Sequence, residues 1–365
     1  MVELIANVNN AINGFVWGVP MLVLLVGTGI LMTILTKFFQ LSHIGHWFKN
    51  TVGGIFHDQH VTKHTDADDQ SISQFQSLCT ALAATIGTGN IVGVASALVA
   101  GGPGAIFWMW IVAFFGMMTN YSENVLGIYY RRKNFKGEWS GGAMYYLKDG
   151  LGSYKGCKQI GAVLAVLFSA FCLLASFGIG NMSQVNSIAA NMTSAFSIPA
   201  TVTGIVLVII GALVIVGGLK RIAAVTEKLV PFMAIAYVIG ALVIFFANIG
   251  HVGAVFTAIF KGAFGLRAVG GGIVGSGVKL ALTWGMKRGV FSNEAGLGSS
   301  VMVHSSSNVK EPVRQGMWGI FEVFADTMVV CTLTAFAVLS SGLIDLDTGA
   351  VLVDVSGSAL VGQAF

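Results

Sequence analysis

Residues 73–100 read SQFQSLCTALAATIGTGNIVGVASALVA, an apolar block long enough to cross a bilayer that carries glycines near its middle. Gly87 and Gly89 flank Thr88, and glycine is a poor helix former that lets the backbone leave helical geometry. Unwound backbone inside a membrane persists only where something satisfies its N–H and C=O groups. We therefore expect this span to come apart near Thr88, where freed N–H groups can bind a carboxylate and freed carbonyls a sodium ion. Close helix packing by Gly87, Gly89 and Gly93 is the alternative.

The composition of the whole chain is that of a membrane protein. Of its 365 residues, 55% are hydrophobic and 10% are charged. A soluble domain carries about 25% charged residues. The net charge is only +4, and the basic residues lie in loops rather than in one patch. These observations exclude a nucleic-acid-binding protein and a disordered chain.

Eight apolar blocks are predicted to cross the membrane, and a ninth begins near Ala359. The eight blocks cover about residues 16–35, 73–100, 105–130, 160–179, 200–216, 229–249, 270–300 and 313–339. Two amphipathic segments, Met1–Phe15 and Val252–Phe264, are expected to lie along the membrane surface. The histidines between His43 and His64 lie in a solvated loop without cysteine, so no metal other than sodium is expected.

The distribution of basic residues predicts the orientation of the chain. If alternate loops lie on one side, that side holds 15 of the 20 lysines and arginines. Basic loops are normally cytoplasmic. We therefore predict that the N-terminus lies outside and that the basic cluster from Arg131 to Lys158 lies in the cytoplasm.

The seventh block contains a second candidate break. Residues 282–299 read LTWGMKRGVFSNEAGLGS. They hold four glycines that allow a break, Gly285, Gly289, Gly296 and Gly298. They also hold three ionisable residues, Lys287, Arg288 and Glu294, which are costly in an apolar block unless they are paired or hydrated. The alternative is that this span ends near Met286 and that a cytoplasmic loop follows.

The two glycine-interrupted spans are five membrane segments apart. An odd offset gives them opposite directions, which is the arrangement of inverted-repeat transporters with a site between the repeats.

Other polar residues lie in the third and eighth blocks. Three of them, near the cytoplasmic end of the third block, are expected to snorkel to the interface: Asn120, Glu123 and Asn124. Glu322 and Asp326 lie inside the eighth block, where an acidic residue is a functional candidate by default. The alternative is that they pair with Lys287 or Arg288 and only hold the helices together.

Four stretches resemble the sodium:alanine symporter family, the alanine or glycine:cation symporters. They are GTGNIVGVASA from Gly87, GGPGAIFWMWIVAFFG from Gly101, GGAMYYL from Gly141 and FSNEAGLGS from Phe291. The resemblance implies an all-α polytopic membrane protein with the inverted-repeat fold of the bacterial leucine transporter, preceded by one extra helix. It also implies sodium-coupled uptake of alanine or glycine across a bacterial inner membrane. No enzyme activity, cofactor or nucleic-acid partner is expected.

The resemblance also implies which residues bind the two cargoes. The predicted substrate-binding residues are Thr88, Gly89, Asn90, Gln76, Thr283, Trp284, Gly285 and Met286. The predicted sodium-binding residues are Thr85, Ile86, Gly87, Ser292 and Asn293.

The family fold has ten core helices, and this chain reaches the seventh and the start of the eighth. We therefore predict an extra helix and loop at 1–72, a first repeat at 73–250, an incomplete second repeat at 251–365, and C-terminal truncation. Two alternative functions remain open. One is a proton-coupled amino-acid transporter of the same fold with Asp326 or Glu294 as proton carrier, and the other is an inactive fragment.

Overall fold

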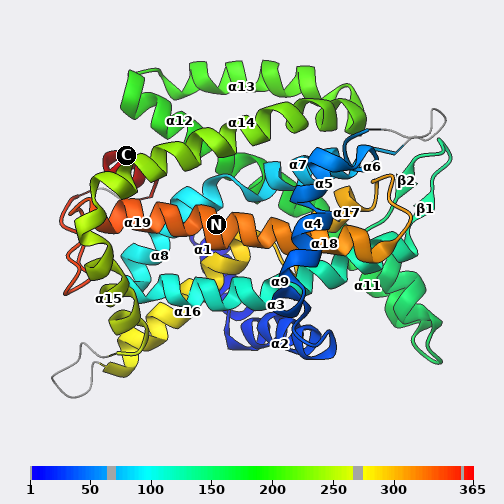
Figure 1. Cartoon of the computed structure of the whole chain (residues 1–365), viewed down its shortest axis with the longest axis horizontal. Helices are drawn as coiled ribbons and strands as arrows, with labels where there is room; N and C mark the ends of the chain where they lie inside the picture. The colour runs from blue at the N-terminus through cyan, green and yellow to red at the C-terminus, as the bar shows by residue number, and fades with distance from the viewer. Residues whose placement is uncertain (1, 64–70, 266–273, 355–356) are drawn as a thin grey trace.

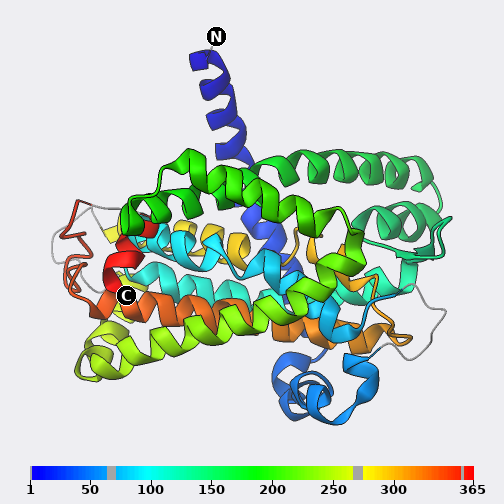
Figure 2. The ribbon, with the colours of Figure 1, turned by 90° about the horizontal axis from the view of Figure 1, so that it is seen from above.

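The computed structural model describes residues 2–63, 71–265, 274–354 and 357–365. Within them, the chain is almost entirely helical (Figure 1). The helices before the first break are α1 (Val2–Val16), α2 (Val19–Leu35), α3 (Phe39–Ser42), α4 (Ile44–Asn50), α5 (Val52–His57), α6 (Gln59–Thr62) and α7 (Gln74–Thr85). The predicted first span is therefore α2, and the polar loop after it folds into short helices. Helix α1 points away from the bundle in Figure 2.

The second and third blocks form the first half of the core. A π-helical turn, η1 (Gly89–Gly93), leads into α8 (Val94–Gly101), and α9 (Gly104–Tyr130) follows a turn in which Gly102 has φ +67°. A two-stranded antiparallel hairpin, β1 (Arg132–Lys133) and β2 (Trp139–Ser140), comes next. The short turns α10 (Ala143–Tyr145), η2 (Tyr146–Gly150) and η3 (Leu151–Ser153) then lead to α11 (Lys158–Phe177).

The fourth block is longer than the sequence predicted. After α11 the chain continues through η4 (Gly178–Met182) into α12 (Ser183–Phe196), so one helical unit extends over Lys158–Phe196. The glycines Gly178 and Gly180 widen the helix into a π-turn instead of ending it. Next come α13 (Ala200–Ile215), α14 (Gly218–Ala247), η5 (Ile249–His251) and the amphipathic α15 (Val252–Ala263). Helix α14 begins eleven residues before the predicted Leu229 and includes Pro231.

The remaining elements are α16 (Val274–Asn293), α17 (Ser300–His304), α18 (Pro312–Val323), η6 (Phe324–Cys331), α19 (Thr332–Ser340) and α20 (Ser358–Ala364). The first residues of the predicted seventh block, 270–273, lie outside the described residues. Five described helices are long and apolar enough to cross a membrane, or six if the bent pair α7 and η1–α8 counts as one span. The chain is therefore a multi-pass membrane protein.

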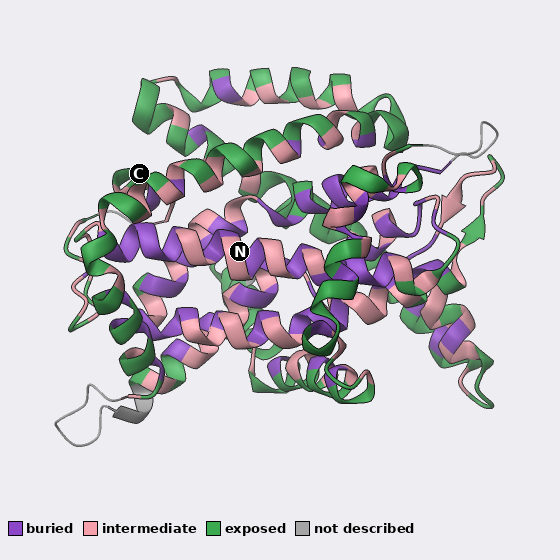
Figure 3. Cartoon of the chain, in the orientation of Figure 1, coloured by how far each residue is buried: buried purple, intermediate pink, exposed green. Residues whose placement is uncertain are grey.

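Burial separates central helices from peripheral ones (Figure 3). In the most apolar 18-residue stretches of α9 and of α18–α19, 61% of the residues are buried inside the protein, against 11% for α11–α12 and α14. Lipid can cover the apolar side chains that the outer helices expose, so these helices need few protein contacts. The central helix α9 packs on both α16 and α18, and these three helices position the polar residues described below.

Gly104 provides a test of this packing, because a Cβ there would overlap the backbone of Gly262 where α9 crosses α15. We expect Gly104→Ala to lower the free energy of unfolding by about 1–3 kcal/mol through overpacking. The matched control is Gly204→Ala in α13, where an added Cβ meets nothing within 4 Å. Thermal unfolding in detergent should leave the control unchanged or slightly stabilised, and equal midpoints for the two variants would contradict this packing.

Candidate functional site

The second span is broken where the sequence predicted. Helix α7 ends at Thr85, the chain is not helical at Ile86 and Gly87, and the two halves of the span differ in direction by 45°. The N–H of Gly87 donates to the side-chain oxygen of Asn90 (2.8 Å), and the N–H of Thr88 donates to that of Gln184 (3.3 Å). Side chains thus satisfy the N–H groups that the break leaves without helical partners, as backbone in an apolar setting requires.

A buried carboxylate lies directly behind this break. The Asp326 carboxylate accepts hydrogen bonds from the Asn90 amide (2.7 Å) and from the hydroxyls of Ser292 (2.8 Å) and Thr327 (2.7 Å). Asp326, Asn90, Ser292 and Thr327 are all at most 1% exposed. We call these four residues the Asp326 cluster. It joins η1, the end of α16 and η6, so it links both glycine-interrupted spans to the eighth block.

Gly89 allows the two interrupted spans to meet. A Cβ built on Gly89 would lie 3.0 Å from the Cα of Ser292, which is tighter than ordinary packing. The absence of a side chain at Gly89 brings Asn90 close enough to donate to the Ser292 hydroxyl at 3.1 Å. The glycine is therefore needed for this close approach.

A cavity of about 590 Å³ opens on the other side of the break. Its wall includes the residues Thr85 to Gly89, together with Gln184 of α12 and Met233 of α14. The hydroxyl of Thr88 is buried at this wall and has no hydrogen-bond partner among the described residues. A buried polar atom without a partner is uncommon in native proteins. The Thr88 hydroxyl is therefore a candidate to bind a ligand in this cavity.

The seventh block also breaks, but later than its first two glycines. Helix α16 continues through Gly285 and Gly289 to Asn293, and the irregular stretch follows at Glu294–Ser299. Glu294, Gly296 and Gly298 have φ of +55°, +89° and +73°, values that favour glycine. The Glu123 carboxylate accepts a hydrogen bond from the Gly296 N–H (3.1 Å). The alternative that this span ends near Met286 is wrong.

The structure brings most of the predicted site residues together and leaves five apart. Thr85, Ile86, Gly87, Thr88 and Gly89 line the cavity, while Asn90, Ser292 and Asn293 lie at or beside the Asp326 cluster; the Asn293 amide donates to the Thr327 hydroxyl (3.2 Å).

The residues left apart are Gln76 and the run Thr283–Met286. Gln76 sits at the far end of α7, where its side chain accepts the Ser73 N–H in a capping box. The run Thr283–Met286 lies in the continuous part of α16, and Gly285 packs against Ala105 and Trp108 of α9. Among the described cavity-lining residues, α16 contributes Phe291 and none of these four.

One expectation and one alternative about other polar residues are also wrong. Asn120 and Asn124 are fully buried and do not reach an interface. Glu322 accepts hydrogen bonds from Asn120 and contacts His304 instead of pairing with Lys287 or Arg288. The cationic groups of these two residues lie over the Trp284 ring, 6.0 Å and 5.3 Å from its centroid. An aromatic face stabilises a cation and removes the need for a carboxylate partner.

Gln184 was missed by the sequence analysis. A signal was present, because Gln184 is one of several amide side chains in an apolar helix, with Asn181 and Asn191 nearby. Polar residues in such helices tend to face a cavity or another helix.

A helix interrupted inside an apolar span, beside a polar cluster and a cavity, is characteristic of secondary transporters. The sodium:alanine symporter family matches residues 2–365, and the chain belongs to this family. It is 45% identical over 357 residues to the sodium/alanine symporter AgcS of Methanococcus maripaludis, covering 98% of this chain and 74% of that protein. It is 35% identical to the probable sodium/glutamine symporter GlnT of Bacillus subtilis, covering all of this chain and 72% of that one.

The role of Asn90 can be tested, because its side chain hydrogen-bonds both the Gly87 N–H at the break and the Asp326 carboxylate. We expect Asn90→Ala to lower the free energy of unfolding by about 1–3 kcal/mol, because it leaves the Gly87 N–H and part of the Asp326 carboxylate without partners. Asn191→Ala is the control, since the Asn191 amide donates only to a carbonyl of its own helix. Thermal unfolding in sodium-free detergent checks this, and an Asn90→Ala midpoint equal to the control would refute the role.

Proposed function

We propose that this protein is a secondary active symporter that couples sodium influx to uptake of a small neutral amino acid, alanine or glycine, by alternating access. The observation that carries the proposal is the break at Ile86–Gly87, which has a cavity on one side and the buried Asp326 carboxylate on the other. A zwitterion and a cation placed on these two sides would each contact the same unwound segment. Binding of one would therefore favour the conformation that binds the other.

The cavity side suits the amino acid. The Thr88 N–H begins the second half of the broken span, and the Gln184 oxygen that accepts from it occupies the position that a substrate carboxylate would take. The unpartnered Thr88 hydroxyl can donate to the same carboxylate. The remaining wall is mainly apolar, with Met233 and Ile179 among its residues, which fits a short aliphatic side chain.

The Asp326 cluster suits a hard monovalent cation. Its donor set consists of oxygen atoms from a carboxylate and two hydroxyls, and hard cations prefer oxygen ligands. A buried carboxylate is costly without a compensating charge. Among the described residues no salt bridge reaches Asp326, so a cation at this site would supply the missing charge.

The relatives support the coupling ion more firmly than the amino acid. Both named symporters carry sodium in their names, whereas one is named for alanine and the other for glutamine. We propose a cytoplasmic membrane as the location, with the loop after α9 on the cytoplasmic side, because the basic residues of the sequence gather in the loops of that side.

Proton coupling is the second candidate function, because a proton on Asp326 would neutralise the same buried charge. A relative from Bacillus subtilis, 39% identical over 333 residues, is named a putative sodium/proton-dependent alanine carrier protein. The two candidates differ in what drives uptake into vesicles: a sodium gradient at constant pH, or a pH gradient without sodium.

Replacing Asp326 tests the cation site. In vesicles with a sodium gradient we expect labelled alanine to accumulate, and Asp326→Asn to raise the sodium concentration for half-maximal uptake at least about tenfold, or 1.4 kcal/mol. Asp347→Asn, in an exposed loop, should behave as the unmodified chain. Alanine binding to the purified protein, compared in sodium and in choline, separates lost coupling from lost transport. Uptake or binding that ignores sodium would defeat the proposal.

Thr88→Val tests the amino-acid site, because it removes a hydroxyl that has no partner to lose. We expect stability to stay within about 0.5 kcal/mol while the dissociation constant for alanine rises about tenfold. Thr203→Val is a matched control: its hydroxyl in α13 is also buried without a partner among the described residues, and it does not line the cavity. Equal alanine affinity in the two variants, measured by isothermal titration calorimetry, would exclude Thr88 from the site.

A further inference from the structure

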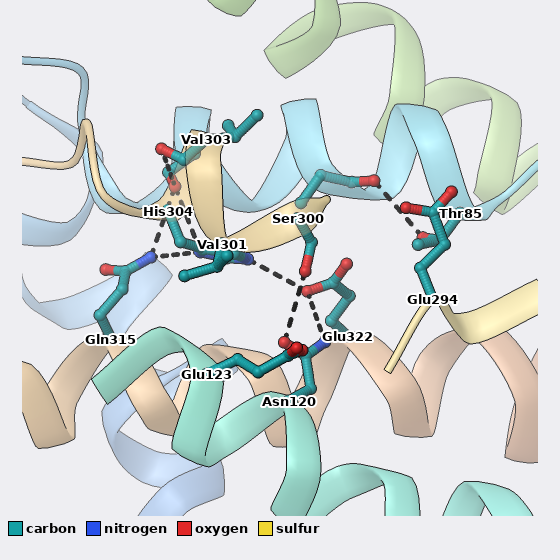
Figure 4. Close-up of polar contacts among 12 residues, drawn as sticks. Thr85, Asn120, Glu123, Glu294, Ser300, Val301, Val303, His304, Gln315 and Glu322 are labelled. Carbon is teal, nitrogen blue, oxygen red and sulfur yellow. Dashed lines mark hydrogen bonds and ion pairs between the residues drawn. The ribbon is translucent and has the colours of Figure 1, made fainter. Parts of the chain in front are cut away.

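A second buried polar centre lies away from the cavity and the Asp326 cluster. His304 at the end of α17 faces Glu322 of α18, with the imidazole Nε2 3.0 Å from the carboxylate Oε2 (Figure 4). Both side chains are completely buried. The Asn120 amide of α9 donates to the same oxygen at 3.1 Å. The proposed uptake mechanism gives this pair no role.

The surroundings of His304 can accept the imidazole with or without a proton on Nδ1. That nitrogen lies 2.5 Å from the Gln315 amide and 3.2 Å from the Ser77 hydroxyl. The other end of the Gln315 amide accepts from the Ser307 hydroxyl at 3.0 Å. An amide presents a donor at one end and an acceptor at the other, and a hydroxyl can do either. Turning the Gln315 amide over would therefore satisfy the imidazolium as well as the neutral ring.

The surroundings of Glu322 favour a pair that is neutral overall. Its Oε1 is buried and has no hydrogen-bond partner among the described residues. Like charges also act on Glu322, because the carboxylates of Glu123, Glu294 and Asp326 repel its negative charge. An uncompensated charge is costly in such a setting. One proton, on either the imidazole or the carboxylate, removes it.

Arg131 holds the backbone that follows His304. From the end of α9 it donates to the backbone carbonyls of Ser305, Ser307 and Val309, and so fixes the segment after α17.

We propose that His304 and Glu322 form a proton-binding site, separate from the Asp326 cluster, that holds α7, α17 and α18 together when one proton is bound. The contacts run from Ser77 on α7 through His304 on α17 to Glu322 on α18. Helices α7 and α17 are the halves of the two broken spans that lie toward the predicted cytoplasm. When that side opens, water reaches the pair, accepts the proton and solvates the remaining carboxylate.

The proton site adds to the proposed function and can be tested without any cargo. Its direction follows from linkage: the closed form binds one more proton than the open form, so a rise in pH favours opening. Cys79 reports the opening, because it lies on α7 two residues after Ser77 and is 1% exposed. We would measure its alkylation rate by maleimide and peptide mass spectrometry, in choline buffer without alanine, from about pH 6 to about pH 9.

The comparison variant is Glu322→Gln, whose side chain is neutral and cannot ionise in this pH range. Its amide oxygen can keep the bonds from His304 and Asn120, while its nitrogen replaces the oxygen that has no partner. The pH dependence of thiol chemistry is common to both proteins and cancels in the ratio of their rates. We expect the wild-type rate, relative to Glu322→Gln, to rise with pH by up to about tenfold per unit.

Glu138→Gln is the matched control, because Glu138 lies in the hairpin and accepts from Asn134 there. It should follow the wild type at every pH. If Glu322→Gln folds poorly, Glu322→Met is a neutral variant of similar size for the same ratio. A ratio that does not change with pH overturns the proton site even if sodium-driven uptake is observed. A rising ratio supports it even if uptake fails.

Discussion

The need to satisfy unwound backbone and a buried carboxylate at the same point constrains the rest of the structure. Asn90 does both, since its oxygen accepts the Gly87 N–H and its nitrogen donates to Asp326. This double role requires η1, the end of α16 and η6 to converge, and Gly89 makes that convergence possible. The central helices α9 and α18 are buried because they support this convergence from behind.

Two polar centres of different character result from this arrangement. The Asp326 cluster offers oxygen atoms around a carboxylate beside a cavity, which suits an ion that arrives with a substrate. The His304–Glu322 pair is surrounded by groups that can exchange donor and acceptor roles, which suits a proton. Both lie on the eighth block, four residues apart at Glu322 and Asp326, so a shift of α18 relative to its neighbours would disturb both centres together.

The sequence predicted the membrane class and the position of the first break, because glycine composition and hydropathy act locally. It did not tell which of the four glycines in the seventh block, Gly285, Gly289, Gly296 and Gly298, lie at the second break. Gly285 and Gly289 serve close packing against α9 there, and whether a glycine breaks a helix or packs against one depends on its neighbours in space.

The partners of Glu322 were equally beyond the sequence, because His304 and Asn120 contact it from parts of the chain that no local pattern connects. The rings that lie against the cations of α16, Trp284 and Phe291, are by contrast only three or four residues away on the same helix. Gln76 lies apart from the cavity, because a polar residue near the start of a span can equally cap its helix.

The weak burial of α12 and α14 has a consequence for how this family diversifies. These helices form the outer wall of the cavity, while the Asp326 cluster, the proposed cation site, belongs to the tightly packed centre. Residues in the wall can therefore change size or polarity without straining the Asp326 cluster. Under the proposed function, such a division would let related proteins exchange one amino acid for a bulkier one while retaining the same driving ion.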